Sequence, residues 1–449
     1  MALTCILCKA LETIVRDHIL QHLVTNNLIS KLQYGFLPKR STTLQLLRVM
    51  DEWTAALERG EEVDVIYTDF QKAFDKVPHR RLMSKLRSYG ISSQLCKWIE
   101  AFLTGRRQCV RVNGSKSAWA NVISGVPQGS VLGPLLFVLY INDLPESVLA
   151  SLYLYADDSK VFSSINSSES LIMLQEDLHK MHLWSRKWLL LFHPEKLKML
   201  TITSSKQPRN CLDHRVYFIG DFRVQQSTLE TDLGVDVDPL LNFNEHIANR
   251  VKSASITMGA IRRSFRYMNH GMFRLLFKGM VRCKLEYAAP VWSPSSEDHV
   301  DKIESVQRSA TSMLGGMKGL DYPERLKHLK LTTLRARRWR GDMIETFKLV
   351  HGFYDKTVAP PLPLRADSSA RPLRGHPLLL QTERNTTARR RSSFTQRVVP
   401  LWNSLSWEVV KPSTVNTFKN RLDKAWEGQD FLYNYKEYPT GARLSATIY

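Results

Sequence analysis

The sequence contains few cysteines and no arrangement of them that would organise a domain. Its six cysteines are spread along 449 residues, and the close pair Cys5 and Cys8 has no second pair at the spacing of a zinc site. Nothing in this pattern indicates a disulfide framework or a zinc knuckle. A reducing, intracellular compartment is therefore expected.

Long apolar runs are also missing. The N-terminal segment is interrupted by Lys9 and Glu12, which predicts an amphipathic helix rather than a signal peptide. The stretch from Val131 to Leu144 is too short and too interrupted to span a bilayer, so no membrane partner is expected. The apolar face of the N-terminal helix is expected to comprise Leu7, Ala10, Leu11, Ile14 and Ile19.

Acidic residues are scarce in the second half of the chain. The formal net charge is +20, from 63 Lys and Arg against 43 Asp and Glu. Residues 1–246 contain 28 basic and 26 acidic side chains, whereas residues 247–449 contain 35 and 17. This asymmetry favours a near-neutral catalytic half joined to a basic half that binds phosphate backbones, although basic surface can also serve only solubility.

Three aspartates stand out against this background. Asp69 ends the β-branched run that begins at Val63, and Asp157 and Asp158 follow the strand-like run Leu152 to Tyr155. The second run continues as Lys160-Val161-Phe162, which predicts a hairpin with the two aspartates as its turn. Tight hairpin turns favour Asn-Gly or Asp-Gly, so an Asp-Asp pair is a poor choice for folding alone.

A bound cation would resolve this conflict. Adjacent carboxylates raise each other's pKa unless a cation neutralises them, and oxygen-only ligation suits Mg²⁺. Two such ions, roughly 3.5–4 Å apart, can activate an attacking hydroxyl and stabilise a leaving phosphate oxygen. The alternative for an isolated Asp-Asp pair is a solvated turn.

A glycine-flanked loop lies between the two acidic sites. It runs from Ser124 to Pro134 and contains Pro127-Gln128-Gly129, followed by an apolar helix from Leu135 to Ile141 that should be buried. Together with Asp69-Phe70-Gln71-Lys72-Ala73-Phe74-Asp75 and Tyr155-Ala156-Asp157-Asp158, this ordered set resembles the reverse transcriptases of non-LTR retrotransposons, in particular jockey-like LINE elements.

The resemblance implies roles for individual residues. Asp69, Asp157 and Asp158 would be the catalytic carboxylates and would hold two Mg²⁺ ions, with Mn²⁺ as an alternative and the Phe70 carbonyl as an added ligand. Phe74 would pack under the incoming sugar and exclude a 2′-hydroxyl, and Gln128 and Gly129 would contact nucleotide and template. Lys196 would act as a general acid for the leaving pyrophosphate. Asp75 is expected to pair locally rather than bind metal.

One position departs from the family. An arginine commonly follows the Gly-Phe of the finger motif, but here Leu37 follows Gly35-Phe36, leaving Lys39 and Arg40 as the nucleotide-binding cations. The chain also starts inside a finger motif and has no counterpart of the upstream endonuclease domain. It is therefore expected to be an N-terminally truncated copy.

The resemblance implies an α+β right-hand polymerase with fingers, palm and thumb. Residues 1–50 would be partial fingers, 51–205 the palm with finger insertions, 206–245 a small β hairpin region, 246–350 a helical thumb, and 351–449 a linker and basic C-terminal region. Nucleic-acid contact is expected of basic residues that interleave with aromatics, namely Arg262, Arg263, Arg266, Arg337, Arg338 and Arg340. The run Arg389-Arg390-Arg391 is expected to hold template RNA, act as a nuclear address or form a solvated loop.

These observations predict an RNA-directed DNA polymerase of a retrotransposon. Its partners would be an RNA template, a DNA primer and deoxynucleoside triphosphates, within a nuclear or cytoplasmic ribonucleoprotein. A second hypothesis is a catalytically inactive nucleic-acid-binding remnant of such an element. A third, a two-metal nuclease, leaves the Pro-Gln-Gly loop and Phe74 unexplained.

Overall fold

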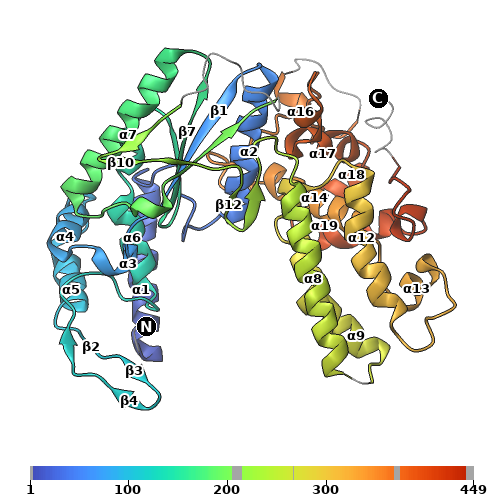
Figure 1. The fold of residues 1–449 in the computed structure, drawn as a ribbon, viewed down its shortest axis with the longest axis horizontal. Coiled ribbons are helices and arrows are strands. Elements are labelled where there is room, and N and C mark those ends of the chain that lie inside the picture. Colours follow the sequence, from blue (N-terminus) through green and yellow to red (C-terminus); the bar gives the residue numbers. More distant parts are fainter. Residues whose placement is uncertain (1–3, 205–214, 266, 369–374, 441–449) are drawn as a thin grey trace. The chain divides into compact units, whose positions relative to one another are not determined.

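The chain forms two compact units in a computed structural model that describes residues 4–204, 215–265, 267–368 and 375–440 (Figure 1). Unit 1 comprises Met1–Thr42 and Glu61–Thr228, and unit 2 comprises Thr43–Gly60 and Leu229–Tyr449. Helices and sheet are mixed, which confirms the predicted α+β class. The segment from Thr43 to Gly60 groups with the C-terminal half, a grouping that the division along the sequence did not anticipate.

Unit 1 is built on a five-stranded sheet with the strand order β11-β8-β1-β7-β6. The central strand β1 pairs antiparallel with both β7 and β8. The first five of its seven residues are all buried, a pattern typical of a strand covered on both faces. The strands are β1 (Glu62–Thr68), β6 (Ser151–Tyr155), β7 (Asp158–Ile165), β8 (Lys198–Ile202) and β11 (Gln225–Gln226).

The core of unit 1 surrounds helix α6 (Leu132–Ile141). Nine of its ten residues are buried, as the unbroken apolar sequence predicts. Helix α7 (Ser168–Trp188) packs on β7 with Leu174, Leu178 and Met181 buried along one side. The other helices of the unit are α1 (Ile6–Thr25), α3 (Ala73–Lys76), α4 (His79–Ser88), α5 (Ser93–Leu103), η1 (Leu144–Ser147) and η2 (Pro194–Lys196).

Short strand pairs complete unit 1. Two of them form a ribbon that extends away from α5 (Figure 1), with strands β2 (Arg107–Gln108), β3 (Arg111–Val112), β4 (Ser115–Lys116) and β5 (Ala120–Asn121). The small hairpin expected after residue 206 is present as β9 (Phe218–Ile219) and β10 (Phe222–Arg223).

The predicted face of the N-terminal helix is right at Ile19 and wrong in its first half. Leu7, Leu11 and Ile14 are exposed, whereas α1 buries Ile19, Leu23 and the polar Glu12. Glu12 faces inward because one of its carboxylate oxygens accepts hydrogen bonds from the first backbone N–H groups of α6, those of Val131 (2.7 Å) and Leu132 (3.0 Å). A buried carboxylate from another helix thus caps the start of α6 together with the Ser130 hydroxyl, which accepts from Gly133 N (2.9 Å).

Unit 2 is mainly helical, as expected of the second half of the chain. Its helices are α2 (Thr42–Glu58), α8 (Asn244–Ser264), α9 (His270–Leu276), η3 (Phe277–Arg282), α10 (Cys283–Glu286), α11 (Ala289–Trp292), α12 (Glu297–Ser312), α13 (Tyr322–His328), α14 (Leu334–Val350), α15 (Arg365–Ser368), α16 (Ala388–Ser392), α17 (Phe394–Asn403), α18 (Trp407–Val410), α19 (Val415–Ala425) and η4 (Asp430–Leu432). One hairpin, β12 (Glu230–Asp232) and β13 (Val235–Val237), precedes α8. Within the described ranges, no helix combines the length and apolar content needed to cross a bilayer.

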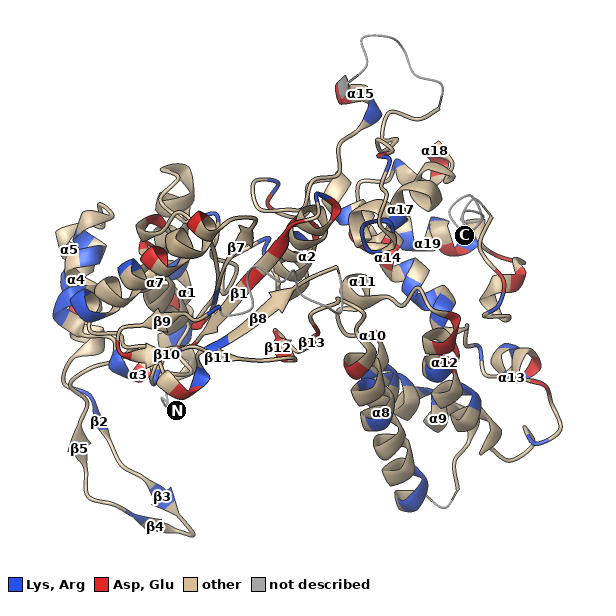
Figure 2. Ribbon diagram, turned by 45° about the horizontal axis from the view of Figure 1, so that its top comes forward, with Lys and Arg blue, Asp and Glu red and all other residues tan. Residues whose placement is uncertain are grey.

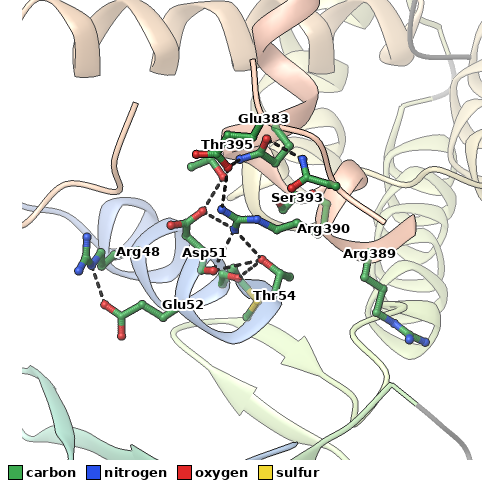
Figure 3. A network of polar contacts seen from close by, with 12 residues as sticks. Arg48, Asp51, Glu52, Thr54, Glu383, Arg389, Arg390, Ser393 and Thr395 are labelled. Carbon is green, nitrogen blue, oxygen red and sulfur yellow. Dashed lines mark hydrogen bonds and ion pairs between the residues drawn. The ribbon is translucent and has the colours of Figure 1, made fainter. Parts of the chain in front are cut away.

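The basic run Arg389-Arg390-Arg391 has a structural role, which corrects the expectation for Arg390. Its guanidinium is buried and donates to the Asp51 carboxylate (2.6 Å) and to Thr54 Oγ1 (3.1 Å) of α2 (Figure 3). Thr395 Oγ1 donates to the same carboxylate oxygen. A buried arginine cannot contact RNA, so this residue fastens α2 to α16 and α17.

Candidate active site

The three predicted catalytic aspartates gather at one end of the sheet in unit 1. The last registered pair of β1 and β7 joins Thr68 to Ser159, so the next step along both strands sets Asp69 opposite Asp158. The hydroxyls of Thr68 and Ser159 also hydrogen-bond to each other. Strand register therefore brings together carboxylates that lie far apart in the sequence.

The turn of the β6–β7 hairpin differs in detail from the prediction. Tyr155 pairs with Asp158, so the two turn residues are Ala156 and Asp157, and Asp158 is the first residue of β7. Ala156 has a φ of 55°, a left-handed conformation that tight hairpin turns require and that glycine would adopt with less strain. Consecutive residues of a strand point to opposite faces, so separating Asp157 from Asp158 in this way gives the two carboxylates different surroundings.

Lys196 lies at the centre of this acidic group. Its ammonium donates to Asp69 Oδ2, and a hydrogen bond from His193 N to Asp69 O (2.8 Å) fixes the two segments side by side. The bond to Asp69 raises the pKa of Lys196, with further contributions from the charges of Asp158 and Asp157. Lys196 is therefore a protonated cation at neutral pH.

The pKa of Asp157 is raised, first by burial and then by the negative charge of Asp69, while Lys196 opposes the shift. Additional positive charge beside these carboxylates would reverse this effect. In the described part of the chain, no group of three or more His, Cys, Asp and Glu side chains is arranged so that it could hold a metal ion. The donor set of carboxylates alone nevertheless fits Mg²⁺, which keeps water and substrate oxygens in its shell.

The two predicted aromatic residues of the site lie in different surroundings. Phe70 is buried and stacks on Phe192 at 4.7 Å between ring centroids, so its ring belongs to the core while its carbonyl stays beside Asp69. Phe74 is partly exposed, stacks on Phe137 of α6 at 4.7 Å and meets the edge of Phe36 at 6.2 Å. The position of the Phe74 ring is thus fixed from two sides.

The Pro-Gln-Gly loop packs against the turn that carries Phe74. Val126 N donates to Phe74 O (2.8 Å), and a Cβ on Gly125 would lie only 2.6 Å from Asp75 O. Gln128 is exposed, and its amide donates to Asp75 Oδ1 (3.0 Å). Asp75 was expected to pair locally, but its partner is the predicted nucleotide-binding residue Gln128, which lies 53 residues further along the chain. Gly129 is exposed with a φ of 97°.

The finger residues are divided between surface and interior. Lys39 is exposed, whereas Arg40 donates to the carbonyls of Ser30 (2.7 Å) and Gln33. Leu37 is buried, at 7% exposure, so the residue that replaces the usual arginine serves the core.

The predicted nucleic-acid contacts of unit 2 also differ from one another. Arg262 and Arg263 are exposed in the last turn of α8, while Arg266 lies outside the described residues. Figure 2 shows basic residues at this end of α8. Arg337 is ion-paired with Glu286, and Arg340 is paired with Asp423. Arg338 is 3% exposed, which corrects its assignment as a contact because nucleic acid cannot reach a buried guanidinium.

The sequence profile of the family described as reverse transcriptase (RNA-dependent DNA polymerase) matches residues 1–236. The chain belongs to this family. It is 27% identical over 327 residues to the probable RNA-directed DNA polymerase from transposon X-element of Drosophila melanogaster, covering 69% of this chain and 34% of that protein. It is 28% identical over 348 residues to the RNA-directed DNA polymerase from mobile element jockey of the same organism, covering 72% and 36%.

The chain thus spans about a third of the length of these curated relatives, and their origin confirms the resemblance to jockey-like elements. Among solved structures, apo telomerase from Candida tropicalis matches with a TM-score of 0.38 and 11% identity, over 71% of this chain and 54% of that one. A similarity this low adds nothing about activity.

Sequence reasoning missed two residues that hold the candidate active-site hairpin. Gln33 is fully buried, and its side-chain oxygen accepts from the N–H groups of Ala156 (3.1 Å) and Gly35 (2.7 Å). A Cβ on Gly35 would lie 2.4 Å from Ala156 N, so only glycine fits this close approach. The finger motif containing both residues was noticed, but its contact with the hairpin depends on the tertiary structure.

Proposed function

We propose that this chain is the polymerase portion of a retrotransposon RNA-directed DNA polymerase. It would add deoxynucleotides to the 3′-hydroxyl of a DNA primer on an RNA template. The observation that carries this proposal is the meeting of Asp69, Asp157 and Asp158 at one end of the sheet, beside Phe74 and the Pro-Gln-Gly loop, in a member of the reverse transcriptase family.

The three aspartates would hold two Mg²⁺ ions, with Mn²⁺ as an alternative. When bound, the ions supply positive charge at the attacking hydroxyl and at the leaving phosphate oxygens. The raised pKa of Asp157 and the mutual repulsion of the carboxylates provide the physical reason for cation binding at this place. Phosphoryl transfer depends mainly on positioning and charge stabilisation, so no protein nucleophile is required.

The remaining residues position the nucleotide. Phe74, fixed by Phe137 and Phe36, would lie under the sugar and leave no space for a 2′-hydroxyl. Gln128 and Gly129 would contact nucleotide and template from an exposed loop, and Lys39 and Arg40 would lie near the triphosphate. Lys196 would donate its proton to the leaving pyrophosphate, a role compatible with its cationic state and with its 58% exposed side chain.

The second candidate is a catalytically inactive nucleic-acid-binding remnant. The burial of Leu37 supports it, because the position that commonly carries an arginine in the family here contributes no charge. In this case the acidic cluster would persist without function, and RNA binding would depend on the basic residues of unit 2.

Primer extension on an RNA template with Mg²⁺ distinguishes the two candidates. Wild-type protein and the Asp221→Ala variant, which removes an exposed carboxylate elsewhere in unit 1, should extend the primer. The Asp157→Ala variant should lose extension while its RNA binding and melting temperature stay near wild type. Absence of extension in all three proteins, with RNA still bound, would establish the remnant.

A further inference from the structure

A pocket of about 590 Å³ in unit 2 has more basic than acidic residues in its lining. It lies where helices η3, α14 and α19 meet the segment that follows α13. Six cationic residues line it, three of them lysines that were not singled out in the sequence. The six are Lys278, Arg282, Lys330, Arg337, Arg340 and Lys424.

The carboxylates near this basic pocket do not balance its charge. Glu286 is shared by Arg337 and Arg282, with Arg282 Nε 3.4 Å from Glu286 Oε1. Asp423 accepts both hydrogen bonds of the Arg340 fork, at 2.6 and 2.8 Å. Asp423 and Glu427 are the acidic residues that line the pocket among the described residues. With Glu286 counted as a neighbour, the six cations outnumber the carboxylates two to one.

The electrostatic effect of this imbalance is visible in two side chains. Burial lowers the pKa of Lys278, and the neighbouring charges of Arg282, Arg274 and Arg337 lower it further. Burial also lowers the pKa of Arg282, and the charges of Arg337 and Arg340 act in the same direction against Glu286. An anion in the pocket would relieve this repulsion.

The backbone around the basic pocket is unusual in two places. Lys278 and Arg282 lie on η3, a six-residue π-helix, and such segments are rare and frequently occur at functional sites. Lys330 follows α13 with a φ of 49°, a conformation in which glycine or asparagine is favoured. Both irregularities place a basic side chain at the pocket.

We propose that this basic pocket binds the phosphodiester backbone of the nucleic acid on which the polymerase works. The inference rests on the proposed function for the identity of that nucleic acid. The flexible lysines supply point charges that can bind phosphate directly. The arginines, whose forks are held by Glu286 and Asp423, add positive charge around them. Arg337 and Arg340, predicted from the sequence as contacts, thereby act together with Lys278, Arg282, Lys330 and Lys424.

The test compares two triple variants of the full chain. Lys278→Gln, Lys330→Gln and Lys424→Gln remove three exposed lysines of the basic pocket. Lys318→Gln, Lys356→Gln and Lys436→Gln remove the same charge from exposed positions of unit 2 outside it. The dissociation constant for a labelled RNA–DNA duplex is measured against salt concentration, with EDTA present so that no catalysis is needed.

The pocket variant should bind about 10- to 100-fold more weakly near 0.1 M salt, and the slope of log K against log salt should shrink by about 2 to 3. The control variant should remain within about threefold of wild type. Equal dissociation constants and equal salt slopes for the two variants would overturn nucleic-acid binding at the pocket. Primer extension, and thus the proposed function, would be unaffected by that result. Conversely, the wild-type protein could fail to extend primers while the pocket variant still loses duplex binding. That result would support nucleic-acid binding at the pocket and reject the proposed polymerase function.

A mononucleotide titration provides the second arm. The pocket variant should bind a deoxynucleoside triphosphate as wild type does. Loss of nucleotide binding with unchanged duplex affinity would show that the pocket takes free phosphate groups and would overturn the assignment to the backbone.

Discussion

At the scale of single residues, the active site is defined by how each side chain is held. Phe74 has two aromatic neighbours, and Lys196 has three carboxylates around it. Gln128, in contrast, is exposed and bonded only to Asp75 among the contacts described for it. These differences allow separate tests for sugar selection and for proton transfer.

Substitution of Phe74 tests sugar selection. Phe74→Val should reduce the preference for deoxynucleotides over ribonucleotides, on the order of 10- to 100-fold in the ratio of kcat/KM values, because the smaller side chain opens space for a 2′-hydroxyl. Steady-state extension with matched dATP and ATP measures this ratio. A uniform loss of activity with an unchanged ratio would assign Phe74 to the core alone.

Substitution of Lys196 separates its role in proton transfer from its competition with Mg²⁺ for the Asp69 carboxylate. Lys196→Gln should lower kcat on the order of 100-fold, the usual contribution of a general acid. It should also lower the Mg²⁺ concentration needed for half-maximal activity, because no ammonium then bonds to Asp69. Lys97→Gln, on the exposed surface of α5, serves as the control. An unchanged kcat would remove Lys196 from the reaction.

At the scale of secondary-structure elements, two buried polar side chains make contacts between parts of unit 1. The finger segment supports the active-site hairpin through Gln33, and Lys85 of α4 lies among aromatic rings of α6 and α7. Lys85 donates to the Tyr140 carbonyl and to Asp143, and its ammonium lies 3.8 Å from the centroid of the Trp188 ring.

The support of the hairpin is tested with Gln33→Leu. This change leaves the N–H groups of Gly35 and Ala156 without their acceptor, at a cost of about 1–3 kcal/mol each. The free energy of unfolding should fall accordingly, and kcat should fall further than KM changes, because Asp157 loses its position. Chemical denaturation and primer extension measure the two effects, with the exposed Gln94→Leu as control. Normal stability in Gln33→Leu would contradict the contact.

Lys85 predicts a pH dependence of stability. Burial lowers the pKa of Lys85 to about 8, against about 10.4 in an unfolded chain. The folded state therefore disfavours the charged form of Lys85. Below pH 8 Lys85 is charged in both the folded and the unfolded state, and its charge lowers the free energy of unfolding. This penalty disappears as pH rises from about 8 to 10.4. Lys85→Met should exceed wild type in stability at pH 7, by at most about 3 kcal/mol, and match it near pH 10.5. Urea unfolding at several pH values checks this, and a difference independent of pH would refute it.

At the scale of the whole molecule, contacts between distant parts of the chain define the two units. Helix α2 precedes the central strand of unit 1 in the sequence but belongs to unit 2, where Asp51 pairs with Arg390. Glu58 of α2 accepts hydrogen bonds from the backbone and side chains of Thr386 and Thr387, which lowers the pKa of Glu58 to about 2 against the opposing effect of burial.

The Asp51–Arg390 contact is tested by removing one partner. Arg390→Met leaves a buried carboxylate without its cation and should lower the free energy of unfolding by about 3–5 kcal/mol. Arg391→Met should cost much less, because Arg391 is exposed and bonds only to backbone carbonyls of Asn385 and Thr386. Thermal unfolding of both variants gives the comparison. Equal effects would mean that the buried pair does not stabilise unit 2.

The sequence by itself determined the elements whose signal is local. The β-branched run before Asp69 is strand β1, the apolar run after the Pro-Gln-Gly loop is the buried helix α6, and the ordered motifs identify the family. The strand and the helix depend on residues adjacent in the chain, so composition and period are sufficient to predict them. The family follows instead from the resemblance of the ordered motifs to those of known proteins.

Only the tertiary structure decided which side chains meet. Residues far apart in the sequence meet in each of the following features. They are the burial of Glu12 and Leu37, the support of Ala156 by Gln33, the ion pair of Arg390 with Asp51, and the basic pocket. A polar side chain is exposed or buried according to whether the fold supplies its partner, because an unpaired buried charge is too costly to persist. That partner comes from another element, and its identity is fixed only when the chain has folded.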